Sequence, residues 1–296
     1  MTKKDLIIKL LREKSLSLAR IADIAETSTI YVSMIGKNEG IKDPTPSLEY
    51  PNPNDMLDIH IPKFTRMIAK GDAFAFLICG DPGVGKSYMV EKTLNEFPSL
   101  QWDSYGGDIS PIGLYKKLFE NREGVVVFDD IDAVFDNKIA ANILKTALNS
   151  KDVRKISYLK RNHELFESHG MSDDQMFSRY IREQKYPNSF VYDGGCIFIS
   201  NNTKEDINSA VRDRSIAEIE IRFTLLEMIS RIQQIIHSLN PSNGSLDINE
   251  KYEVLQYLYE NAQAQGKNIS LRGFIKALTY RVHDASTWKD LSKWYI

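Results

Sequence analysis

The chain contains Gly80-Asp81-Pro82-Gly83-Val84-Gly85-Lys86-Ser87, which matches the pattern G-x-x-x-x-G-K-[ST]. An apolar run, residues 73–79, precedes it and predicts a buried strand. Glycines leave the backbone free to fold around phosphates, and a helix that begins near Lys86 would add its positive dipole end. The stretch therefore predicts a site for a nucleoside triphosphate, although an isolated match can also be a plain glycine turn between a strand and a helix.

Two side chains of this segment have predicted roles. Lys86 is expected to reach the β- and γ-phosphates, and the Ser87 hydroxyl to take one position on Mg²⁺. The rest of the glycine loop and Tyr88, which follows it, complete the predicted binding segment. Mg²⁺ is therefore an expected cofactor.

The charge of the chain is nearly balanced, with 38 basic and 40 acidic residues among 296 and a net charge of −2. This balance argues against a generally basic nucleic-acid coat, and 42% hydrophobic residues are ordinary for a globular protein with a core. Cys79 and Cys196 lie in apolar runs and predict buried free thiols in a reducing compartment. No run approaches the ~18 apolar residues of a membrane span and the first residues are charged, so we expect a cytoplasmic protein that acts without a membrane.

The positions of the prolines and the helical patterns predict that the chain is divided into four parts. Five of the ten prolines fall between Pro44 and Pro62, which predicts an extended tether, residues 44–62, after a small helical head, residues 1–43. In the core, residues 63–223, apolar strands alternate with helices expected at 86–96 and 111–121, which predicts an α/β fold with a parallel sheet and helices on both faces. Helical patterns at 225–238, 249–265, 270–284 and 287–295 predict a helical lid, residues 224–296.

Two carboxylates follow a second buried strand pattern. Residues 125–128 are Val-Val-Val-Phe, and Asp129 and Asp130 come next. Open α/β sheets bind their ligands at the carboxyl ends of strands, so we expect Asp129 to hold Mg²⁺ and Asp130 to orient an attacking water. The alternative is that the two acids cap the next helix.

The glycine loop and this acidic pair resemble the Walker A and Walker B motifs of AAA+ ATPases, of a mobile-element or phage type, over the core and the lid. The resemblance implies a P-loop NTPase core with an AAA+ lid, ATP as the nucleotide, hydrolysis to ADP and phosphate, and assembly into a homo-oligomeric ring, expected to be hexameric, or a spiral. The second acid of the family is usually Glu. Asp130 is one methylene shorter, and water positioning tolerates little displacement, so slow turnover is an open alternative.

Three more segments resemble positions of that family. Asn202, after the strand expected at 196–200, resembles sensor 1, which contacts the γ-phosphate or the water. Arg214, with Arg212 as its helper, resembles the arginine finger that reaches the nucleotide of a neighbouring subunit. Arg272, in the first turn of a lid helix, resembles sensor 2. For each arginine the alternative is an ordinary surface side chain.

The first part of the chain offers a candidate DNA contact. Residues 21–35 resemble a helix-turn-helix, with Ala22, Val32 and Ile35 at the apolar packing positions. Glu26 stands where the motif often has glycine, and it tolerates a left-handed turn less well. Residues 20–37 are therefore expected to contact DNA, and a protein-docking helical head is the alternative.

An insertion, residues 150–193, lies between the second and third strands of the core. Residues 154–161 alternate like a strand, with residues 190–192 as the expected partner strand. Lys155, Lys160 and Arg161 with Tyr158 are candidates for holding a threaded nucleic-acid strand by charge and stacking. A solvated surface insertion is the alternative.

The leading prediction is an ATP-hydrolysing AAA+ oligomer that remodels or loads onto DNA or a DNA-bound protein complex. A helix-turn-helix-like head on a small AAA+ module is similar in layout to transposition target-selection ATPases and helicase loaders. Two alternatives stay open. One is a protein-remodelling or maturation ATPase that acts on a polypeptide client, and the other is a nucleotide-gated scaffold with slow turnover.

Overall fold

The computed structural model describes residues 2–13, 18–41, 52–130, 137–150, 153–160 and 162–293. Contacts within the chain divide it into two compact units. One unit is formed by Met56–Arg222, and the other by Met1–Asp55 together with Phe223–Ile296. Within the described ranges, no helix combines the length and the apolar character that crossing a lipid bilayer requires.

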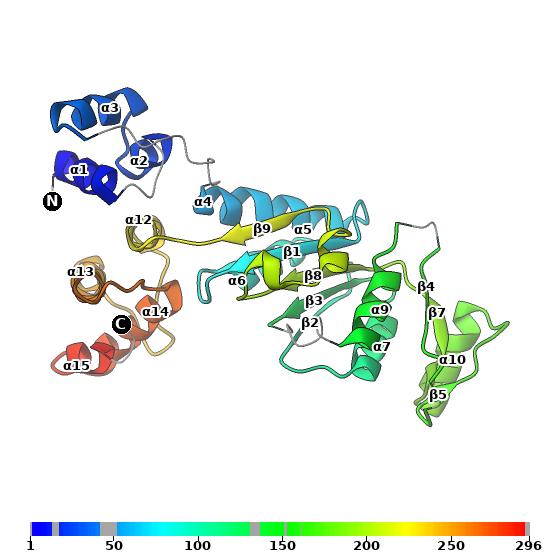
Figure 1. Ribbon diagram of the computed structural model, residues 1–296. Coiled ribbons are helices and arrows are strands. Elements are labelled where there is room, and N and C mark those ends of the chain that lie inside the picture. Colours follow the sequence, from blue (N-terminus) through cyan, green and yellow to red (C-terminus); the bar gives the residue numbers. More distant parts are fainter. Residues whose placement is uncertain are drawn as a thin grey trace. The chain divides into compact units, whose positions relative to one another are not determined.

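A five-stranded parallel sheet forms the middle of the first unit (Figure 1). Its strands, in spatial order, are β2 (Trp102–Gly106), β3 (Val125–Asp129), β8 (Gly195–Ile199), β1 (Ala75–Gly80) and β9 (Glu218–Ile221). Every residue of β1 and β8 is buried, because parallel strands in the middle of such a sheet are covered on both faces. In this order β1, the strand that precedes the glycine loop, lies between β8 and the edge strand β9.

Helices cover both faces of the sheet: α5 (Ile61–Ala69), α6 (Lys86–Leu94), α7 (Pro111–Glu120) and α9 (Lys138–Ala147). α7 and α9 pack on the face to which Leu77 of β1 belongs. Successive side chains of a strand point to opposite faces, and the neighbouring Phe76 meets Phe64 of α5, with ring centroids 5.4 Å apart. The α/β fold class predicted from the sequence is thus confirmed, with α5 and α6 on the second face (Figure 1).

The proline-rich stretch differs from the extended tether predicted over residues 44–62. Residues 42–51 lie outside the described ranges, whereas α4 (Pro53–Asp55) and a π-helical turn, η1 (Met56–His60), precede α5. Pro53 is the first residue of α4, and Pro62 lies in the first turn of α5. Pro53 loses no helical hydrogen bond, since first-turn N–H groups have no partner within the helix. Pro62 follows residues that are already helical, so its missing N–H falls where the π-helical turn η1 passes into α5. The tether prediction is therefore wrong for residues 53–62.

The insertion contains the predicted hairpin. β4 (Lys155–Ser157) pairs antiparallel with β7 (Ser189–Val191), which sets Ile156 opposite Phe190. The chain between these two strands forms β5 (Leu165–Phe166), α10 (Asp173–Glu183) and β6 (Tyr186–Pro187). Arg154 fixes the base of the insertion, because its Nη1 donates to Ala147 O at 2.8 Å and to Gly194 O at 2.9 Å.

The four side chains expected to hold a threaded nucleic-acid strand differ in their exposure to solvent. The ring of Tyr158 packs on that of Tyr115, with centroids 5.5 Å apart, so it is partly buried against the core. Lys155 and Lys160 are exposed to solvent. Arg161 lies outside the described residues.

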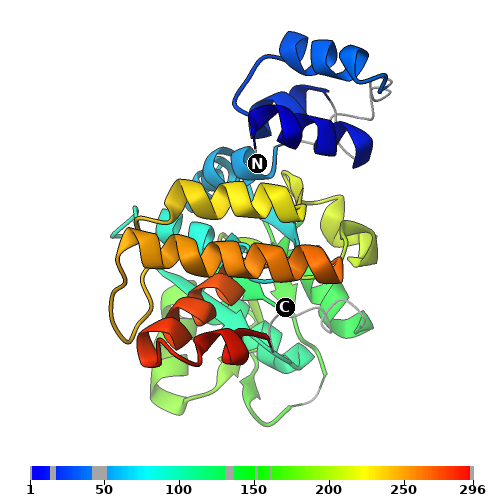
Figure 2. The same cartoon turned by 90° about the vertical axis from the view of Figure 1, so that its left-hand side faces the viewer.

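The second unit contains helices from both ends of the chain: α1 (Lys3–Glu13), α2 (Leu18–Ile24), α3 (Thr29–Asn38), α12 (Leu225–Ile235), α13 (Ile248–Gln265), α14 (Leu271–His283) and α15 (Trp288–Ser292). α12 and α13 lie side by side (Figure 2). Ala22, Val32 and Ile35 are buried in the core of the first three helices. Glu26, in the turn between α2 and α3, has a left-handed φ of 47°, and Lys3 Nζ donates to its carbonyl oxygen at 3.0 Å.

Candidate nucleotide site

Three glycines give the loop after β1 its shape. Gly80 has a φ of 137°, and a Cβ at this position would lie 2.0 Å from the carbonyl oxygen of Ile221 in β9. Gly83 and Gly85 have φ values of 72° and 106°, in the region that side chains disfavour. Gly85 directly precedes the first residue of α6, so the loop ends at a helix N-terminus, where backbone N–H groups favour an anion.

The ammonium group of Lys86 spans this loop. Nζ donates to the carbonyl oxygens of Gly80 and Asp81, each at 2.8 Å, and to Asn201 Oδ1 at 3.0 Å. The residue is 5% exposed, and burial lowers the pKa of Lys86, an effect that the charges of Asp130 and other nearby acids oppose. The cation is therefore held at the loop by neutral oxygens that a phosphate group can replace.

The next residue of α6 forms the candidate magnesium site. Ser87 Oγ donates to Asp129 Oδ2 at 2.7 Å, which brings the start of α6 to the carboxyl end of β3. A hydroxyl and a carboxylate oxygen are the hard ligands that Mg²⁺ prefers, so Ser87 and Asp129 would suit the ion. The described residues contain no group of three or more His, Cys, Asp or Glu side chains suited to a metal.

Asp130 contacts the side-chain amide of Asn201, which follows the neighbouring strand β8. Its backbone has a φ of 56°, and its N–H donates to Ile199 O at 3.0 Å. Asn201 Nδ2 donates to Asp130 Oδ1 at 2.5 Å. These contacts arise because β3 and β8 are adjacent and parallel, so the residues after both strands meet at one edge of the sheet.

The structure brings the side chain of Asn201 to the glycine loop, whereas the sensor role predicted for Asn202 stays a prediction. The Asn201 side chain contacts both Lys86 and Asp130. Asn202 donates its backbone N–H to Ser200 Oγ at 3.0 Å. The sequence signal was an asparagine after an apolar strand, and two adjacent asparagines satisfy it equally.

The two arginines proposed as finger and helper lie at the end of the short helix α11 (Ser209–Arg212). Arg212 is its last residue, and Arg214 follows it. Arg212 Nε donates to Glu218 Oε2 in β9 at 3.0 Å. Arg214 Nη1 lies 4.0 Å from Asp213 Oδ2, and the side chain is 30% exposed. Action on a neighbouring subunit stays a prediction for both.

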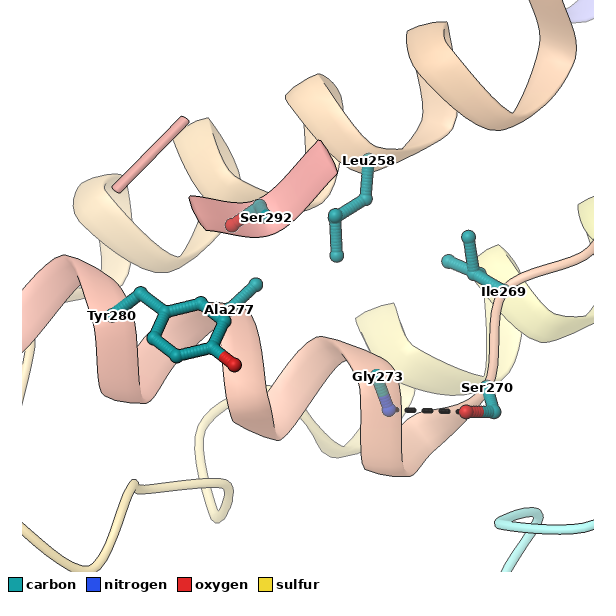
Figure 3. A pocket seen from close by; sticks show the side chains of 7 residues that line it. All are labelled: Leu258, Ile269, Ser270, Gly273, Ala277, Tyr280 and Ser292. Atoms are coloured by element: carbon teal, nitrogen blue, oxygen red, sulfur yellow. Dashed lines mark hydrogen bonds between the residues drawn. The ribbon is translucent and has the colours of Figure 1, made fainter. Parts of the chain in front are cut away.

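The predicted lid helix begins at the expected place. Ser270 Oγ accepts a hydrogen bond from Gly273 N at 3.0 Å and caps α14 (Figure 3). Arg272 is exposed in the first turn, and Phe274 and Leu278 are fully buried on the apolar stripe. Because Arg272 and the glycine loop belong to different units, the contact of Arg272 with a γ-phosphate stays a prediction.

Sequence reasoning missed one charged group at the loop. Arg222, directly after β9, donates from Nη1 to Asp81 Oδ1 and from Nε to Glu220 Oε1, each at 2.8 Å. The sequence offered no signal for it, because β9 itself was not predicted. Tyr88, which the prediction included, is 64% exposed.

Comparisons with known proteins find a related sequence and similar solved structures. The chain is 26% identical over 247 residues to an uncharacterized 36.7 kDa protein in the nrdC–mobD intergenic region of enterobacteria phage T4, a match that covers 78% of this chain and 70% of that protein. No protein-family profile matches the chain. Among solved structures it is similar to a single-substitution variant of Thermotoga maritima RuvB, with 11% identity and a TM-score of 0.37, over 76% of this chain and 67% of that one.

Proposed function

We propose that this chain is an AAA+ ATPase that binds ATP with Mg²⁺ and hydrolyses it to ADP and phosphate. One observation carries the proposal: side chains from the ends of three neighbouring strands meet at the glycine loop. Lys86 and Ser87 follow β1, Asp129 ends β3 with Asp130 directly after it, and Asn201 follows β8. Ligands of open α/β sheets bind at this end of the strands.

Each side chain has a role that its position supports. Lys86 exchanges its carbonyl and amide partners for phosphate oxygens, which places a positive charge on the group that is transferred. Ser87 and Asp129 would hold Mg²⁺, which would supply positive charge beside the phosphates. Asp130 orients the water that attacks the γ-phosphorus as the bond to ADP breaks, and Asn201 holds the Asp130 carboxylate in place.

A catalytic test follows directly. Phosphate release from Mg·ATP is measured for the wild type and for Asp130→Asn. We expect turnover by the wild type and a loss of about 100-fold or more in the variant with ATP still bound. Equal rates in the two proteins would remove the proposed role of Asp130, and no turnover by the wild type under assembly conditions would favour the nucleotide-gated scaffold.

The oligomeric part of the proposal rests on Arg212, the last residue of α11, and on Arg214, which precedes β9 in the chain. We propose that Arg214 completes a neighbour's site, with Arg212 as its helper. Mixing Lys86→Ala with Arg214→Ala subunits tests this, because a shared site regains activity where intact halves meet. Full activity of Arg214→Ala assembled alone would contradict it.

For the client we propose DNA or a DNA-bound protein complex, contacted through residues 20–37 and residues 150–193. Exposed Lys155 and Lys160 support a phosphate contact in the insertion. DNA binding by the full chain should weaken with added salt and should stimulate ATP hydrolysis. Binding that is absent at low salt, together with stimulation by an unfolded polypeptide, would favour the protein-remodelling alternative.

A further inference from the structure

Arg222 and Asp81 form an ion pair at the start of the glycine loop. The guanidinium Nη1 donates to Asp81 Oδ1 at 2.8 Å, and Nε donates to Glu220 Oε1 at the same distance. Arg222 is the last residue of the unit that contains the sheet, and Asp81 is the second residue of the loop. The pair therefore joins the loop to the end of β9.

The backbones of the two segments are also joined. Asp81 N donates to Ile221 O at 3.1 Å, and Gly80 approaches the same carbonyl so closely that no Cβ fits. On the other side, the carbonyl oxygens of Gly80 and Asp81 accept hydrogen bonds from Lys86. Asp81 is thus held through its carboxylate by Arg222 and through its carbonyl by the lysine that is proposed to bind phosphate.

The charge of Asp81 is unfavourable for a loop that binds polyphosphate. A carboxylate beside bound phosphates repels them, and the repulsion is greatest when no cation lies next to the carboxylate. Arg222 provides that cation, and its planar fork can donate to two carboxylates at once. We infer that Arg222 is a positioning residue of the nucleotide site, which neutralises Asp81 and fixes the first turn of the glycine loop for phosphate binding.

This inference rests on the proposed nucleotide site, and a second ion pair of the same unit offers a matched control. Arg66 donates to both carboxylate oxygens of Glu96, at 2.8 and 2.9 Å. The Arg66 and Glu96 side chains are 43% and 44% exposed, close to the 45% and 36% of Arg222 and Asp81. Exposed ion pairs contribute little to folding, so neither substitution should alter the thermal unfolding temperature by much.

The experiment measures ATP affinity by calorimetry and kcat and KM by phosphate release. Arg222→Gln should weaken ATP binding about five- to tenfold, with kcat at saturating ATP within about twofold of wild type, because it removes a charge that compensates Asp81. The loss should shrink as salt is raised. Arg66→Gln should bind ATP as the wild type does, and Arg222→Lys should give an intermediate affinity, since it keeps the charge without the fork.

The double variant separates charge compensation from simple loss of structure. Asp81→Asn combined with Arg222→Gln removes the repulsion but also the contact that fixes the loop, so its ATP affinity should lie between those of Arg222→Gln and the wild type. A double variant as weak as Arg222→Gln, or an Arg222→Gln affinity equal to that of Arg66→Gln, would overturn the inference while leaving the nucleotide site intact. If Lys86→Ala binds ATP as tightly as the wild type, the proposed site itself is wrong and the inference about Arg222 fails with it.

Discussion

Lys86 and Asn201 are joined by a hydrogen bond of 3.0 Å between Nζ and Oδ1, although 115 positions separate them in the chain. They meet because β1 and β8 are neighbours in the sheet, with Ile78 paired to Ile199. The amide nitrogen of the same asparagine donates to Asp130. Asn201 therefore connects the cation proposed to bind phosphate with the carboxylate proposed to orient water.

Replacing Asn201 tests that connection. Asn201→Ala should lower kcat by about 10- to 100-fold, because Asp130 loses the partner that fixes its carboxylate. Asn202→Ala is the matched control and should change kcat by less than about twofold. Phosphate release at saturating ATP measures both. A larger loss in Asn202→Ala than in Asn201→Ala would return the sensor role to the residue predicted from the sequence.

Substitutions of Asp130 distinguish the effect of its charge from the effect of its left-handed backbone conformation. Its φ of 56° lies in the left-handed region, where Asn is tolerated as well as Asp, so Asp130→Asn should fold normally and bind ATP within about threefold of wild type. Asp130→Glu restores the usual length of the second acid and should preserve or raise kcat. Circular dichroism and single-turnover kinetics would check both variants. A Glu variant that is folded but inactive would show that the shorter side chain is required.

The contact between Ser87 and Asp129 predicts a specific dependence on magnesium. Ser87→Ala should raise the Mg²⁺ concentration needed for half-maximal ATPase activity by about tenfold, because one oxygen ligand is lost. ATP binding measured in EDTA should change little. The contrary outcome is an unchanged Mg²⁺ titration, which would place the ion elsewhere.

Arg154 should determine the stability of the insertion. Its guanidinium is 3.8 Å from the centroid of the Phe74 ring, and the residue is 4% exposed. Arg154→Met leaves two buried carbonyl oxygens without their donor, at a cost of about 2–4 kcal/mol in the free energy of unfolding. Lys155→Met, at the exposed neighbouring position, should change that free energy by less than ~0.5 kcal/mol. Urea unfolding followed by circular dichroism compares them, and similar losses in both variants would contradict the anchoring role.

The central strands and most helices could be predicted from the sequence because their signals are local. β1 and β8 are continuous apolar runs, and Ser110 caps α7 through a hydrogen bond of 3.1 Å from Gly113 N. β2 and β9 were missed because they are edge strands. Edge strands are exposed on one side and carry polar residues, as in the Glu-Ile-Glu-Ile sequence of β9.

The candidate site also combines residues that are adjacent in the sequence with residues that are far apart in it. The glycine loop is read from adjacent residues, whereas the partner of Asp81 lies 141 positions away and depends on which strand borders β1. Asn201 and Asn202 are equivalent in the pattern, and only the geometry after β8 distinguishes them. Spatial neighbours of this kind follow from strand order, which a single sequence does not specify.

The most direct test of the nucleotide site is a calorimetric titration of Mg·ATP into the wild type, Lys86→Ala and Lys92→Ala. Lys92 lies on the same helix and is exposed, so its variant controls for loss of one positive charge. We predict that the wild type and Lys92→Ala bind ATP alike and that Lys86→Ala binds at least about 100-fold more weakly. Equal binding by the wild type and Lys86→Ala, or no binding by the wild type, would contradict the account.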